Sequence, residues 1–333
     1  MENDNLKFKN KFVELEDGGG GNKSNELISK IRKFFPVAKK WKNTKDDGAV
    51  FSLGKEKLVF TTDAFIVDPI FFPGGDIGKI AICGTINDLS VMGAVPIGIS
   101  LSVVIEEGFL LEDLKKIIQS IGKVSKETGV PIVTGDTKVT EKGKIDKIEI
   151  TTSGVGLASK VIENSGAKVG DVIIVSGNLG EHAVALLASR FNYRTKIKSD
   201  CQPVTKEIQS ILPYLTSCKD PTRGGAAAVF NEMAEKSKMR FVLEENSLPF
   251  AKETIALSGL LGIDKFSFPS EGRFVATVPQ EDAEKVIKIL RKYNREAKII
   301  GVVSKGNGVW LKTKLGSEKK IEVPREKLIP RIC

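Results

Sequence analysis

The residue with the most unusual chemical position in this sequence is Cys333, the last residue of the chain. Chain ends move freely unless they are tied down, so a terminal thiol can travel between sites as a buried cysteine cannot. The thiolate is the reactive form, and Arg331 partly offsets the α-carboxylate that opposes ionisation. The chain end therefore predicts either an arm that carries a group on sulfur into an active site, or a frayed end that merely finishes in cysteine.

Acidic residues lie immediately before or after predicted apolar segments. Asp46-Asp47-Gly48 precedes one apolar segment, and Asp63 follows the strand-like residues 58–60. Carboxylates that converge in this way suit a hard cation such as Mg²⁺, although turns and caps use the same residues. Asn87 and Asp88 interrupt the apolar face of a predicted helix, where a charge must be paired. A metal ion, a bound phosphate or a buried salt bridge would pair it.

Three further segments combine glycine with charge. Residues 17–25 contain four successive glycines before a predicted helix, and their N–H groups are free to approach an anion. Residues 220–225 place Arg223 beside two glycines at a predicted helix N-terminus, which also suits an anion. Residues 134–138 put Asp136 and a glycine at the predicted end of a strand, with Lys138 nearby. A flexible linker and structural turns are the alternatives for these segments.

The cysteines and the histidine limit the possible chemistry. None of the four cysteines forms a C-x-x-C pair, and His182 is the only histidine. A zinc site built on several histidines is therefore excluded. Acid and base chemistry is expected to depend on Asp, Glu or Lys. His182 stands at the start of a predicted helix, where we expect it to pack or to cap.

The composition indicates a folded protein of two domains. The 333 residues exceed one ordinary core, and 41% hydrophobic with 28% charged residues is typical of globular proteins. No apolar run could span a bilayer and residues 1–10 are too polar for a signal peptide, so we expect a cytoplasmic protein without membrane partners. The net charge is +9, but the basic residues are scattered and aromatics are only 7%, so we expect no nucleic-acid partner.

Helical and strand-like segments follow one another without a strict βαβ repeat, which predicts the α+β class. We expect helices over 77–93, 111–124 and 226–234, and strands over 96–104, 148–152, 172–175 and 274–278. The polar segment 159–170 is the predicted linker between an N-terminal domain, 1–158, and a C-terminal domain, 171–323. Residues 324–333 are the predicted mobile tail that carries Cys333.

These segments together resemble one family closely, the ATP-dependent carbamoyl dehydratases of NiFe hydrogenase maturation. This hydrogenase expression/formation (HypE) family lies in the aminoimidazole ribonucleotide synthetase superfamily. Several of the segments occur across the superfamily and specify only ATP and Mg²⁺, whereas Pro330-Arg331-Ile332-Cys333 singles out the dehydratases. Asp17 and Glu181 depart from the family, which usually has His-Gly-x-Gly-Gly and Gly-Asp-His at these places. The segments that carry the resemblance are 46–49, 60–63, 71–79, 84–89, 133–138, 220–225, 271–273 and 330–333.

The resemblance implies an N-terminal ATP-binding domain that dimerises through its strands, with ATP near the domain and subunit junction. It also implies that a partner carbamoyltransferase places a carbamoyl group on the sulfur of Cys333. ATP-dependent dehydration then gives a thiocyanate, and a HypC–HypD-type scaffold complex that carries iron receives the cyanide.

The resemblance also implies residue roles. Cys333 carries the substrate, and Glu271 and Lys138 are the candidates for proton transfer. The expected Mg²⁺ ligands are Asp47, Asp63, Asp88 and Asp136. The expected nucleotide-binding residues are these four with Lys79, Asn87, Thr137 and Arg223.

Two other functions stay open from the sequence. A small-molecule kinase or synthetase of the same superfamily, of the thiamine-phosphate kinase or selenophosphate synthetase type, would share the acidic segments but not need the terminal cysteine. A non-catalytic scaffold could instead use the tail or the basic surface to dock a partner.

Overall fold

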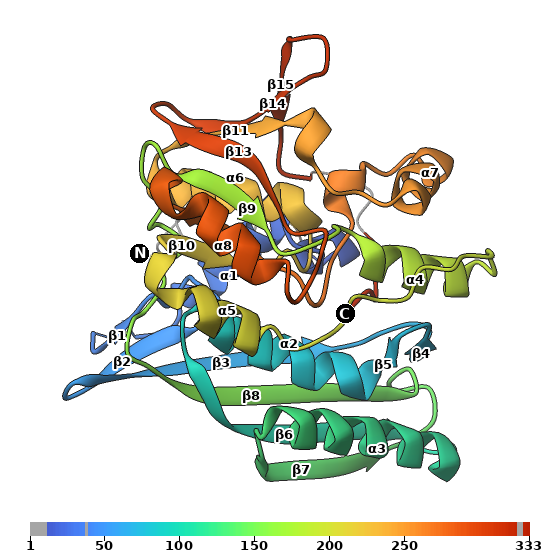
Figure 1. Ribbon diagram of the computed structural model, residues 1–333. Helices are drawn as coiled ribbons and strands as arrows, with labels where there is room; N and C mark the ends of the chain where they lie inside the picture. The colour runs from blue at the N-terminus through green and yellow to red at the C-terminus, as the bar shows by residue number, and fades with distance from the viewer. Residues whose placement is uncertain (1–11, 37–38, 325–328) are drawn as a thin grey trace, which may run out of the picture.

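Two large sheets with their helices build most of this protein, and the computed structural model describes residues 12–36, 39–324 and 329–333 (Figure 1). The first sheet contains six strands, all from the N-terminal half of the chain. Its only parallel pair among the described residues is β6–β7, which α3 connects. The strand order is β1 (Trp41–Lys42), β2 (Ala49–Leu53), β3 (Glu56–Phe65), β8 (Ile148–Ala158), β6 (Val95–Glu106) and β7 (Ile132–Thr140).

The second sheet contains seven strands from the C-terminal half. Among its described strands, pairing is antiparallel except between β11 and β14. The strand order is β10 (Ser217–Lys219), β12 (Val275–Val278), β9 (Val172–Val175), β13 (Lys298–Ser304), β11 (Arg240–Glu244), β14 (Gly308–Lys312) and β15 (Glu318–Ile321). The mixture of helices and antiparallel strands in both halves confirms the predicted α+β class.

The helices complete both halves. The first half contains α2 (Ile77–Val91), α3 (Leu111–Thr128) and the small β4–β5 hairpin (Phe71–Phe72 and Gly75–Asp76); α1 (Asn22–Arg32) follows the short 3-10 helix η2 (Leu15–Gly18). The second half contains α4 (Glu181–Arg190), α5 (Thr205–Ile211), α6 (Gly225–Ser237), α7 (Lys252–Leu261), α8 (Ala283–Leu290) and four 3-10 turns at Leu212–Tyr214, Glu245–Ser247, Lys265–Ser267 and Gln280–Asp282. No described helix has the length and apolar character needed to cross a membrane.

The helix α2 lies between the first sheet and the C-terminal half (Figure 1). Asp76 caps the start of this helix, because its side chain accepts hydrogen bonds from the N–H groups of Gly78 and Lys79. The helix packs closely on α3, since a Cβ at Gly78 would lie 2.7 Å from the carbonyl oxygen of Ile117. Almost every face of α2 is therefore buried, and three of its polar residues, Thr85, Asn87 and Ser90, lie inside the protein.

The sequence places Asp63 and Asp136 at strand ends, and this is wrong for both. Asp63 lies inside β3, where it pairs with Thr152, and Asp136 lies inside β7 opposite Ser102. The glycine before Asp136 is needed for close packing and not for a turn, because a Cβ at Gly135 would lie 2.4 Å from the carbonyl oxygen of Leu101. Extended pairing therefore continues through both acidic segments.

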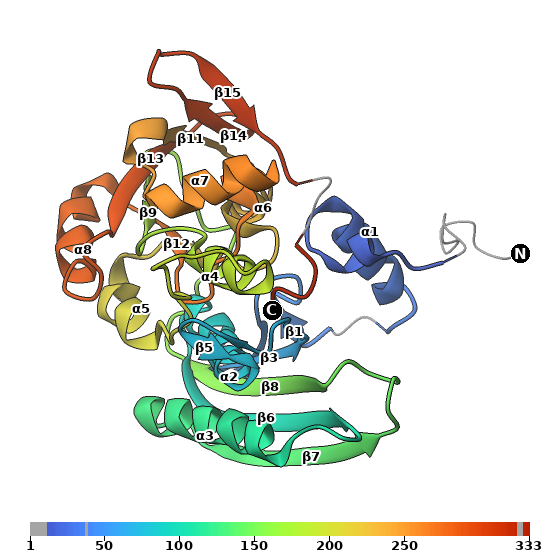
Figure 2. The same cartoon turned by 90° about the vertical axis from the view of Figure 1, so that its right-hand side faces the viewer.

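No helix or strand lies between β8 and β9, and we place the boundary between the domains in this segment, residues 159–171. The chain end lies at the junction of the two halves, near α4 and β3 (Figure 2). Ile329 and Ile332 are buried in the same hydrophobic cluster as residues of α2 and α4. The end of the chain is thus held in place in this structure, and the predicted mobility of the tail stays a prediction.

Candidate active site at the domain junction

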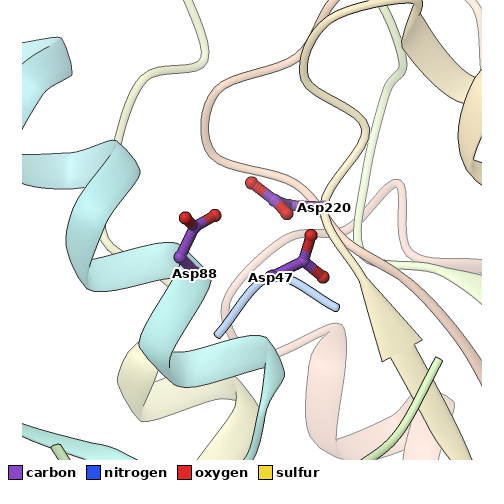
Figure 3. A group of neighbouring side chains, drawn as sticks. All are labelled: Asp47, Asp88 and Asp220. Atoms are coloured by element: carbon purple, nitrogen blue, oxygen red, sulfur yellow. The ribbon is translucent and has the colours of Figure 1, made fainter. Parts of the chain in front are cut away.

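Three carboxylates from distant segments meet between the two domains. Asp47 precedes β2, Asp88 lies on α2, and Asp220 follows β10 (Figure 3). One oxygen from each of the three lies within 4.8 Å of the other two. The sequence predicts Asp47 and Asp88 here, but it does not single out Asp220, which lies in the same segment as Arg223.

Burial makes this acidic cluster electrostatically unfavourable without a cation. Burial and then Asp63 raise the pKa of Asp88 well above its ordinary value. Burial and then Asp47 raise the pKa of Asp220 to about 7. Lys219 forms an ion pair with Asp47 and offsets part of this charge. Hard divalent cations prefer carboxylate oxygens. The three carboxylates, whose charge Lys219 offsets only in part, therefore suit Mg²⁺.

A cavity of about 700 Å³ opens beside the cluster. Its walls include the acidic residues, Phe60, and the glycine loop at residues 17–21. The loop approaches the Arg223 segment so closely that a Cβ at Gly20 would lie 3.1 Å from the Arg223 backbone. A cavity of this size is typical of small-molecule sites, and its glycine loop and arginine suit a phosphorylated ligand.

A second, smaller cavity of about 40 Å³ contains Cys333. Glu271 and Gly84 line it too, and it shares five residues with the large cavity. Cys333 therefore lies against the same carboxylates that border the large cavity. The shared residues are Asp63, Asp88, Asp220, Thr222 and Arg223.

Glu271 is the carboxylate best placed to exchange protons near Cys333. It is 2% exposed, and its Oε1 has no hydrogen-bond partner among the described residues. Burial and then Asp220 raise its pKa well above the ordinary value. Burial and then Glu271 raise the pKa of the Cys333 thiol, so the docked thiol is protonated near neutral pH.

Asn87 holds the backbone on one side of Glu271. Its Nδ2 donates to the carbonyl oxygens of Glu271 and Gln202, each at 3.0 Å, and its Oδ1 accepts from Val204 N at 2.9 Å. The side chain of Asp200, which no sequence motif singles out, accepts from Glu271 N at 2.9 Å. These contacts favour a positioning role for Asn87 over the direct nucleotide contact expected from the sequence.

The remaining predicted residues lie elsewhere. Asp136, Thr137 and Lys138 are exposed on the edge strand β7 and line neither cavity. The Nζ of Lys79 donates to Gly74 O at 2.8 Å, and Lys79 lines neither cavity either. The structure thus gathers Asp47, Asp63, Asp88, Arg223, Glu271 and Cys333, and leaves these four apart from them.

The two halves of the chain match two known domain families. Residues 45–158 match "AIR synthase related protein, N-terminal domain", and residues 168–314 match "AIR synthase related protein, C-terminal domain". The chain is 38% identical to "Carbamoyl dehydratase HypE" of Cupriavidus necator, over 98% of this chain and 97% of that protein. It is 36% identical to the protein of the same name from Escherichia coli, over 96% and 99% of the two chains.

Solved structures show the same similarity. A chain of a HypE–HypF complex superposes with a TM-score of 0.84 at 36% identity, covering 90% of this chain and 99% of that chain. A HypE structure in complex with ATP has a TM-score of 0.81 at 33% identity, covering 97% and 100%. A thiamine monophosphate kinase of Aquifex aeolicus has a TM-score of 0.64 at 19% identity, which shows a shared fold alone.

Proposed function

The chain belongs to the HypE carbamoyl dehydratases, a family of AIR synthase related proteins, and from this membership we propose the reaction that it performs. It dehydrates a carbamoyl group on the sulfur of Cys333, at the expense of ATP, and so makes a thiocyanate for the iron centre of NiFe hydrogenase. The observation that carries the proposal is that Cys333 and Glu271 share a cavity with the acidic residues that border the large pocket.

The reaction takes two steps. The thiocarbamate oxygen attacks the γ-phosphorus of ATP, ADP leaves, and the nitrogen loses one proton. The carbon–oxygen bond then breaks, phosphate leaves, the nitrogen loses its second proton, and the C≡N bond is complete. The oxygen and both hydrogens of the lost water are thus accounted for, the oxygen in phosphate and the hydrogens as protons from nitrogen.

Glu271 is the proposed base for nitrogen. A carboxylate with a raised pKa is a stronger base when ionised, and the free Oε1 faces no competing donor among the described residues. Arg223 lines both cavities and would steer a phosphate between them. Because the substrate is covalently attached to the chain end, both reactants are held within one molecule.

Mg²⁺ is the proposed cofactor, held by Asp47, Asp88 and Asp220, with Asp63 beside them. The fit rests on the close approach of three carboxylate oxygens and on their raised pKa values. When bound, the ion would neutralise triphosphate charge. Within one chain, Asp136 lies too far from these three residues to join them, since β8 and β6 separate β7 from β3.

A homodimer would give Asp136 and Lys138 a role. The face of the first sheet opposite α2 has no described helix over it, and Phe60, Val95 and Ile97 on it are exposed. Asp136 and Lys138 are two residues apart on β7, so strand alternation points them to the same face. We therefore propose that two chains pair through this face, and that Lys138 and Asp136 of one chain serve the other chain's site.

The partner that carbamoylates Cys333 is proposed to be of the HypF type. A related chain crystallises in a HypE–HypF complex, which supports a partner of this kind. A HypC–HypD-type scaffold that carries iron is the proposed acceptor of the cyanide.

Mass spectrometry of the C-terminal peptide tests the function. The protein would be incubated with the carbamoyltransferase, carbamoyl phosphate and Mg-ATP. We expect Cys333 to gain a carbamoyl group and then to lose one water only when ATP is present. Cys333→Ala should form no product and still bind ATP. Carbamoylation without dehydration would overturn the ATP chemistry, and an unmodified peptide in an active mixture would favour the small-molecule kinase.

A further inference from the structure

The side chain of Arg273 folds back onto the segment that carries the proposed base. Gly272 separates Arg273 from Glu271, and Nη1 of Arg273 donates to the carbonyl oxygen of Gly272 at 2.7 Å. Arg273 is only 8% exposed, so its charge lies inside the protein. A buried charge without partners is costly, and the groups that face the guanidinium therefore show what this side chain holds in place.

In the described part of the chain, two carboxylates form ion pairs with this guanidinium. Nη2 of Arg273 lies 3.5 Å from Oε2 of Glu181, the first residue of α4. Nε lies 3.9 Å from Oδ2 of Asp200, whose side chain is fully buried. Neither Nε nor Oδ2 has a hydrogen-bond partner among the described residues. Arg273 is thus the cation that offsets the buried charge of Asp200.

Asp200 in turn holds Glu271. Its other oxygen, Oδ1, accepts from Glu271 N at 2.9 Å. The two segments are pressed together here, since a Cβ at Gly272 would lie 2.0 Å from the carbonyl oxygen of Asp200. Arg273 therefore acts on this segment at two points, directly at the carbonyl of Gly272 and through Asp200 at the N–H of Glu271.

The guanidinium itself has little freedom to move. A Cβ at Gly177, two residues after β9, would lie 2.8 Å from Nε of Arg273 and 2.2 Å from Nδ2 of Asn294. Arg273 also lines neither the large cavity nor the cavity of Cys333. Its position is fixed by packing, and any effect that it has on the reaction passes through its neighbours.

We propose that Arg273 is a positioning residue for Glu271, which holds the main chain of Glu271 and Gly272 directly and through Asp200 and so keeps the carboxylate of Glu271 in the cavity of Cys333. The meaning for catalysis rests on the proposed function. The hold on the main chain can be measured without ATP, metal or partner.

Hydrogen exchange of the full-length protein tests this hold. Arg273→Lys keeps one positive charge, but its single nitrogen cannot replace the three nitrogens of the guanidinium. Glu271 N donates to Asp200, so its exchange rate reports the hold, and mass spectrometry with electron-transfer fragmentation resolves single amides. We expect roughly tenfold faster exchange at Glu271 in Arg273→Lys, with the amides of β12 as slow as in the wild type.

Arg291→Lys is the matched control, because Nε of Arg291 also donates to a carbonyl oxygen of the same domain, that of Ala297. This variant should leave the exchange at Glu271 unchanged. Equal exchange at Glu271 in Arg273→Lys and Arg291→Lys would overturn the proposal. Equally faster exchange at Glu271 and throughout β12 would show a general loss of stability, and would overturn it too.

Single-turnover dehydration of the carbamoylated protein tests the effect on the reaction. We expect the rate at saturating Mg-ATP to fall roughly tenfold in Arg273→Lys, while the affinity for Mg-ATP stays within about threefold. Weaker binding of Mg-ATP with an unchanged rate would overturn the positioning role. Arg273→Gln, which keeps a donor but no charge, should show the same changes and decides the outcome if Arg273→Lys does not fold.

A double-mutant cycle with Glu271→Gln tests whether Arg273 acts through Glu271. If it does, Arg273→Lys should change the residual dehydration rate of Glu271→Gln by less than about twofold, because the group that it positions has already been lost. A further tenfold loss in this background would overturn the proposal. A wild-type protein that is carbamoylated but never dehydrated would instead overturn the proposed function, and the hydrogen-exchange result would stand apart from it.

Discussion

The side chain of Asn87 donates a hydrogen bond of 3.0 Å to the main-chain carbonyl of Glu271, across the junction of the two domains. Asp200 accepts from the N–H of the same residue at 2.9 Å. The peptide groups on both sides of Glu271 are thus held by buried side chains, one from each domain. Asn87 precedes Asp88, so one helical turn of α2 positions both the proposed base and the acidic cluster.

Asn87→Ala is therefore expected to impair the chemical step more than nucleotide binding. Freeing the Glu271 backbone misplaces its carboxylate, and a shift of about 1 Å can cost roughly 100-fold in rate. We expect kcat for dehydration to fall by about this factor while the affinity for Mg-ATP stays within about threefold. Steady-state kinetics and calorimetry measure the two quantities. Weaker nucleotide binding with an unchanged kcat would instead make Asn87 a nucleotide ligand.

Glu271→Gln is expected to stop dehydration but not carbamoylation. The amide keeps the shape of the side chain and cannot accept the nitrogen protons, and loss of a general base typically costs about 10²–10⁴-fold. Single-turnover measurements on carbamoylated protein would follow the loss of water from Cys333. Glu253→Gln, on the exposed side of α7, is the matched control and should react as the wild type does. A wild-type rate in Glu271→Gln would remove this residue from the mechanism.

Asp88→Asn should have opposite effects with and without Mg-ATP. At a pH above the raised pKa of Asp88, the substitution removes one negative charge from a buried acidic cluster, so the free protein should melt at a higher temperature than the wild type. It also removes a proposed ligand, so the affinity for Mg-ATP should fall at least roughly tenfold. Thermal unfolding and titration calorimetry measure the two effects. Wild-type affinity for Mg-ATP would contradict the role of Asp88.

The sequence predicted the helices and strands of this fold better than it predicted which site residues lie close together. The pattern of α2 and its Asp76 cap are local features, so they could be read directly, as could the buried strand β9. The role of Asp200 could not, because it depends on a hydrogen bond to a residue 71 positions away. Asp136 was misplaced because Gly135 signals a turn in sequence, whereas here it allows two strands to approach.

Glu207 should make the stability of the protein fall as the pH rises. Burial raises the pKa of its carboxyl from an ordinary 4.5 to about 7. Between these values the unfolded chain loses the proton and the folded chain keeps it, so stability is lost as the pH rises through this window. The loss is up to about 3 kcal/mol when complete, at 1.36 kcal/mol per unit.

Glu207→Gln removes this titration and keeps an oxygen that can accept from Gln202. Urea unfolding of both proteins from pH 4.5 to 8 should show that the free energy of unfolding of the variant rises relative to that of the wild type as the pH rises. The exposed Glu284→Gln is the control and should stay parallel to the wild type. A constant difference between Glu207→Gln and the wild type would mean that Glu207 is ionised in both states over this range.

The exposed position of Lys138 leads to a test with two inactive variants. Cys333→Ala lacks the substrate carrier and Lys138→Ala lacks the proposed donor from the second chain, so each alone should make no thiocyanate. In a mixed dimer, the site that holds an intact Cys333 receives an intact Lys138 from the other chain. Half of the dimers are mixed at equal amounts, and each has one complete site, so about a quarter of wild-type activity should return.

The two proteins would be mixed and left to exchange subunits. Mass spectrometry of the C-terminal peptide would then measure product formation. The control mixes Cys333→Ala with Glu271→Ala. Glu271 lines the same cavity as Cys333 of its own chain, so a mixed dimer of this pair has no complete site and should stay inactive. Mixed dimers of the first pair that form but stay inactive would show that Lys138 does not act from the other chain.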